Sequence, residues 1–168
     1  MSPMSRIARY ATLLIVLAAG LLVACNGDES EERTAAEAAE RFVNEFPPLN
    51  ERISDLRADL RQRVRRAGQR SPQRLARNLG NAADEFAELR QEVESLPVPA
   101  TLAPQQKVVI EAIRNVRRAL ERMSRVASVN RPPPALGNAR IALMEASREL
   151  GRARSTFADG MAAAGSSG

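Results

Sequence analysis

Four stripes of apolar residues run through the chain from about residue 31 to residue 157. Within each stripe the apolar positions recur at alternating spacings of four and three, which places them on one face of an α-helix. This stretch does not show the period of two that is typical of a half-buried strand. The chain is therefore predicted to be all-α, because four amphipathic helices must bury their apolar faces against one another.

Proline and glycine give the boundaries between these helices. Gly68 suits a helix end, and Ser71 followed by Pro72 suits the start of the next helix. Further prolines end the second and third helices, since proline removes an amide donor and clashes with the preceding turn. We expect a bundle over 31–160, with helices over about 31–68, 72–96, 102–130 and 134–158, followed by a flexible tail over 161–168.

Pro47 and Pro48 fall inside the first stripe. The apolar spacing continues from Phe46 to Leu49 across both prolines, which favours one long helix that is kinked at 47–48. Two helices folded back on each other are the alternative. The overall period of 3.5 and the short connections predict an up-down-up-down four-helix bundle with left-handed packing.

One charged residue lies on the predicted inward face of these helices. This residue is Arg63, near the end of the first helix. Asp59 lies four residues earlier, on the same side of the helix, and is its expected partner.

The N-terminus has the pattern of an export signal. A basic start with Arg6 and Arg9 precedes an apolar run of about 14 residues, which is shorter than a membrane-spanning helix requires. The run ends in Leu22, Val23, Ala24 and Cys25, which resemble the lipobox of bacterial lipoproteins. In that family the cysteine thiol receives a diacylglyceryl group, and cleavage then makes the cysteine the first residue of the mature chain.

The resemblance implies a cleaved signal peptide over 1–24, a lipidated Cys25 and a short tether over 25–30. Two or three acyl chains hold a protein durably on a bilayer, whereas one chain does so only marginally. The expected location is the outer face of the cytoplasmic membrane, the periplasm or the outer membrane. An uncleaved anchor with a free cysteine, or an ordinary secretory signal, are the alternatives.

The composition excludes most catalytic and metal-binding chemistry. Cys25 is the single cysteine and histidine is absent, so the chain lacks a disulfide framework, a thiolate metal cluster and the commonest general base. We expect no catalytic residues, no metal and no cofactor. Nucleic acid is not an expected partner, since aromatic stacking platforms and a recognisable reading motif are missing.

Arginine gathers at one end of the predicted bundle. The formal charge is +5, or about +3 once Arg6 and Arg9 are removed, so the global field is weak. Antiparallel folding nevertheless brings the end of the first helix, the start of the second and the end of the third together. We call the arginines on these segments the arginine pole: Arg61, Arg65, Arg66, Arg70, Arg74, Arg77, Arg114, Arg118, Arg122, Arg125 and Arg131.

These features favour a lipid-anchored, non-enzymatic envelope protein with a structural or adaptor role. The tether is short, so we expect the acidic start of the first helix to face the anchoring bilayer and the arginine pole to point outward. Its partner would be an anionic envelope polymer, an acidic protein or a facing leaflet. The arginines are equally typical of a solvated helix face. An apolar-ligand carrier or periplasmic-type chaperone that uses the bundle interior is the alternative function.

Overall fold

The computed structural model describes residues 29–69, 71–129 and 133–166. Every regular element in these ranges is helical, which confirms the all-α prediction. The elements are α2 (Glu29–Arg65), η1 (Ala67–Gln69), α3 (Pro72–Ser95), η2 (Ala100–Leu102), α4 (Ala103–Ser128) and α5 (Pro133–Ser166).

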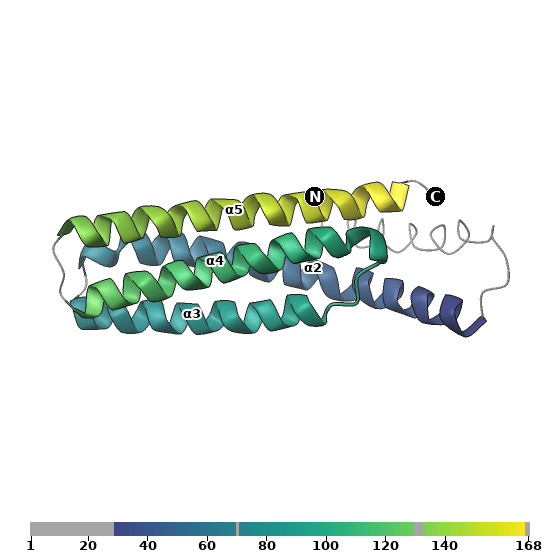
Figure 1. Cartoon of the computed structure of the whole chain (residues 1–168), viewed down its shortest axis with the longest axis horizontal. Helices are drawn as coiled ribbons and strands as arrows, with labels where there is room; N and C mark the ends of the chain where they lie inside the picture. The colour runs from purple at the N-terminus through teal and green to yellow at the C-terminus, as the bar shows by residue number, and fades with distance from the viewer. Residues whose placement is uncertain (1–28, 70, 130–132, 167–168) are drawn as a thin grey trace, which may run out of the picture.

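The four long helices lie side by side as an antiparallel bundle (Figure 1). Each helix contacts the one before it, and α2 also contacts α5, so the four helices close a ring. The end of α2, the start of α3, the end of α4 and the start of α5 lie at the same end of the bundle (Figure 1). The predicted up-down-up-down order is therefore confirmed.

The apolar stripes meet in one continuous core. Its largest aromatic group is formed by Phe42 and Phe46 of α2 and Phe157 of α5, each about 2% exposed or less. The ring centroids lie 5.0 to 5.9 Å apart, which is the usual range for stacked and edge-to-face aromatic pairs. This group joins the N-terminal half of α2 to the C-terminal half of α5.

Small residues determine how closely the helices approach. Buried alanines such as Ala82, Ala112 and Ala146 lie on α3, α4 and α5, and the backbones of α3 and α5 run close along α4. The contribution of α2 to the core consists mainly of phenylalanine, leucine and isoleucine. Since interaxial distance depends on the side chains at the contact, α2 stands farther from its neighbours.

Pro47 and Pro48 lie inside α2, which continues through them as one helix. Both prolines are exposed, whereas Phe46 and Leu49 on either side of them are buried. The chain therefore forms one long helix here rather than two helices folded back on each other. The kink that we expect at 47–48 stays a prediction.

Two predicted boundaries need correction. The helix α2 already includes Glu29 and Ser30, which we expected in the tether, and α5 continues to Ser166 through part of the predicted tail. The predicted helix end at about 158 is thus too early, whereas the flexibility of the tail stays a prediction. Met161 packs against the core, and the alanines that follow it have the highest helix propensity, so the helix does not end after Phe157. Residues 167–168 lie outside the described residues.

None of the described helices is both long enough and apolar enough to span a membrane.

Replacement of Phe46 by alanine tests the aromatic contact between α2 and α5. The substitution removes a side chain that is 2% exposed, and we expect the free energy of unfolding to fall by about 3–5 kcal/mol. Urea denaturation of the full chain in neutral detergent measures this change. The control is Val108→Ala, whose side chain is 58% exposed and which should change stability by less than about 0.5 kcal/mol. Equal effects of the two substitutions would contradict the packing described.

Candidate functional site

The fold brings the helix segments that carry the arginine pole to one end of the bundle (Figure 1). The hydroxyl of Ser124 in α4 donates a hydrogen bond to the carbonyl oxygen of Ala76 in α3, at 2.9 Å. Arg122 and Arg125 lie within one turn of Ser124, and Arg74 and Arg77 lie within one turn of Ala76. This contact therefore brings the segment of α4 that carries Arg122 and Arg125 against the segment of α3 that carries Arg74 and Arg77.

Most members of the arginine pole are solvent-exposed cations. Their side chains form no ion pair with any acid in the described part of the chain; this group comprises Arg61, Arg65, Arg66, Arg74, Arg77, Arg122 and Arg125. Two further members of the pole, Arg70 and Arg131, lie outside the described residues.

Two predicted members of the pole are paired with acids. The guanidinium of Arg114 lies 3.1 Å from the carboxylate of Glu94 and 3.4 Å from that of Glu111. Arg118 lies 2.5 Å from Glu111 and also donates to Asn115 at 2.7 Å. Among the arginines of α4, Arg122 and Arg125, nearer the end of the helix, are therefore the ones that pair with no acid in the described part of the chain.

Ion pairs connect α2 to α3. The predicted pair of Arg63 with Asp59 is present, and Arg63 also pairs with Glu85 of α3 at 3.0 Å. Burial favours a lower pKa for Arg63, but the hydrogen bond with Asp59 and the charge of Glu85 outweigh it and raise the pKa above its ordinary value. Arg52 pairs in the same way with Glu88 and Glu92 of α3.

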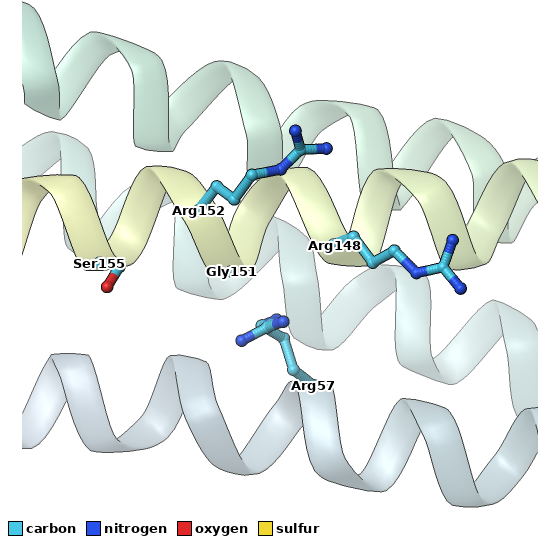
Figure 2. A pocket seen from close by; sticks show the side chains of 5 residues that line it. All are labelled: Arg57, Arg148, Gly151, Arg152 and Ser155. Carbon is cyan, nitrogen blue, oxygen red and sulfur yellow. The ribbon is translucent and has the colours of Figure 1, made fainter.

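The sequence analysis missed a group of arginines at the contact between α2 and α5. A shallow surface groove of about 490 Å³ lies between α2 and α5 (Figure 2). It is lined by Arg57, Arg148, Gly151, Arg152 and Ser155. The available signal was the spacing of four between Arg148 and Arg152, on a helix that an antiparallel ring places next to α2.

A second hollow of about 490 Å³ lies between α4 and α5. Its lining combines apolar side chains, such as Val108 and Ala153, with Glu111, Glu149 and Arg152. Like the groove between α2 and α5, it lies on the surface of the bundle. The described residues contain no cluster of acids with the arrangement of a metal site.

Cys25 and the residues before it, Leu22, Val23 and Ala24, lie outside the described residues, so lipidation stays a prediction. Comparison of the chain with protein-family models, with curated proteins and with solved structures found no match. The candidate sites therefore depend on the geometry and chemistry of this chain alone.

Proposed function

We propose that this protein is a non-enzymatic lipoprotein of the bacterial envelope, with a structural or adaptor role. Acylated Cys25 anchors it to a membrane, and the arginine pole binds an anionic wall polymer or an acidic protein. The observation that carries the proposal is a collection of exposed arginines, at the end of the bundle opposite the start of α2, that pair with no acid among the residues the structure describes.

The length of α2 sets the distance between the anchor and the arginine pole. The helix has 37 residues, which corresponds to about 56 Å at 1.5 Å per residue. Cys25 precedes Glu29 by only a few residues, a span of at most roughly 14 Å when fully extended. Screening in physiological salt is effective beyond about 8 Å, so in a bundle that stands upright on its anchor the pole does not interact with the surface of the anchoring membrane.

The charges near the start of α2 have the opposite sign to those of the arginine pole. Glu37 and Glu40 are exposed there, and Arg41 is engaged by Glu45 at 3.3 Å. The two ends of the bundle therefore differ in charge. An anionic polymer or protein is attracted to the distal end, and several exposed arginines together produce a useful attraction although each contributes only about 0.5–1 kcal/mol.

The alternative function, an apolar-ligand carrier, has no comparable support. Both surface hollows have charged residues in their linings, and core residues such as Leu120 and Leu143 are fully buried by their neighbours. This alternative stays a prediction from the sequence.

Metabolic labelling with an alkyne fatty acid tests the anchor. We expect the wild-type chain to be labelled and to fractionate with membranes, because acyl chains supply about 0.8 kcal/mol per buried methylene. Cys25→Ser should lose the label and leave the membrane fraction. Labelling that persists in Cys25→Ser, or an unlabelled wild-type chain in the cytosol, would contradict the proposal.

Neutralisation of two arginines in α4 tests the arginine pole. We expect Arg122→Gln/Arg125→Gln to reduce retention of the full chain on isolated cell-wall material by about fivefold or more at 50 mM salt. The wild-type retention should itself fall between 50 and 500 mM salt, since the interaction is electrostatic.

The matched control is Arg114→Gln/Arg118→Gln, which removes the same charge from the same helix. These two arginines are already paired with Glu94 and Glu111, so the change in retention should be clearly smaller. Equal losses for the two double variants, or retention that does not depend on salt, would show that the unpaired end of α4 has no binding role.

A further inference from the structure

Like charges face each other across the contact between α2 and α5. Arg57 and, one turn later, Arg61 lie on α2, while α5 contributes Arg148, Arg152 and Arg154. Within the described ranges, none of these arginines has an acid within ion-pair distance. On its other side α2 is held to α3 by ion pairs of opposite charge. The contact with α5 lacks this compensation.

Arg57 is fixed in this contact by the backbone of α5. Its Nε donates a hydrogen bond of 2.9 Å to the carbonyl oxygen of Ser147. Burial lowers the pKa of Arg57, and the positive charges of Arg154 and Arg61 lower it further. The terminal nitrogens Nη1 and Nη2 form no hydrogen bond with any described residue. A half-buried guanidinium thus keeps two donor groups unused in a positive environment.

Gly151 makes room for this guanidinium. A Cβ atom at position 151 would lie 2.8 Å from Nη1 of Arg57, and closer still to Cζ and Nη2. Glycine inside a helix costs about 1 kcal/mol relative to alanine. Gly137, in the same helix, has open space around the corresponding position. Gly151 is therefore the glycine of α5 that permits Arg57 to lie against the helix backbone.

The groove around Arg57 presents hydrogen-bond donors. Figure 2 shows Arg57 reaching from α2 toward Gly151, whereas Arg148 and Arg152 extend away from it along α5. Both of these arginines are exposed, so their long side chains have room to move. Ser155 adds a hydroxyl group to the lining, which contains no acid.

We propose that the groove between α2 and α5 binds a phosphoryl group. Nη1 and Nη2 of Arg57 donate hydrogen bonds to two of the phosphoryl oxygens. Arg148 or Arg152 turns into the groove and donates a hydrogen bond to a third oxygen. Arginine forks match phosphate geometry, and a phosphoryl group offers more acceptor oxygens than a carboxylate does. The bound anion offsets the repulsion between the arginines of α2 and α5 and so bridges the two helices.

Titration calorimetry of the full chain in neutral detergent with inorganic pyrophosphate tests this site. We expect saturable binding that Gly151→Ala weakens at least tenfold, because the new methyl group displaces the guanidinium while the net charge is unchanged. Gly137→Ala is the matched control and should stay within about twofold of wild type. Both substitutions should maintain or raise the melting temperature, which separates lost binding from lost folding.

A second pair of variants tests the charge itself. Arg57→Gln should weaken pyrophosphate binding at least tenfold, and Arg140→Gln, which removes an exposed arginine of α5 outside the groove, should leave it within about twofold. Absence of saturable binding, equal losses in the two members of either pair, or equally tight binding of citrate would overturn the proposal.

Two ligands distinguish the sources of the phosphoryl group. Tighter binding of glycerophosphoglycerol than of inorganic phosphate would support the phosphoryl site and identify its ligand as a phosphodiester, as in a lipid headgroup or a polymer. Tighter binding of inorganic phosphate would support the site and identify its ligand as a free phosphate ion. None of these variants changes Cys25 or the arginine pole, so this test can fail without any consequence for the proposed envelope function.

Discussion

The antiparallel packing of four apolar helix faces is the constraint on which the other features depend. Each face must be buried against its neighbours, and this requirement fixes which helix ends lie together and which side chains face solvent. The same packing that buries Ile113 and Leu120 at the centre of α4 leaves Arg122 and Arg125 exposed at its end. The charge distribution is therefore a consequence of the helix order.

The size of the side chains at the contacts determines how far α2 lies from its neighbours α3 and α5. The alanine-rich faces of α3, α4 and α5 pack closely, whereas the bulkier side chains of α2 keep its backbone at a greater distance. Long arginines extend across the resulting space on both sides of α2. Toward α3 they meet Glu85, Glu88 and Glu92, and toward α5 Arg57 meets the backbone of Ser147 and other arginines. Opposite charge stabilises one contact, and the other is suited to an external anion.

The sequence was sufficient for the helices, their antiparallel order and the pair of Arg63 with Asp59, because each follows from spacing within one helix or from short connections. The pairing of Arg114 with Glu94 joins two different helices and depends on their relative rotation, which periodicity does not specify. The position of Arg57 against Gly151 depends in the same way on how α2 faces α5. The end of α5 was misjudged although the sequence carried a signal for it, because Met161 lies four residues after Phe157, in phase with the apolar stripe, and packs against the core.

The proposed anchoring at Cys25 gives the bundle an orientation on a membrane, which is tested most directly by energy transfer to acceptor lipids. Acylation of Cys25, as proposed, would make an introduced cysteine the only free thiol of the sequence. A donor dye is attached at Glu37→Cys or at Ser128→Cys, both exposed positions. Along α2, the distance from Glu37 to the end of the helix is about 40 Å. Helix α4, which contains Ser128, ends at the same end of the bundle. We expect strong transfer from the label at position 37 and weak transfer from the label at position 128. Equal transfer from both, or stronger transfer from position 128, would contradict a membrane-distal arginine pole.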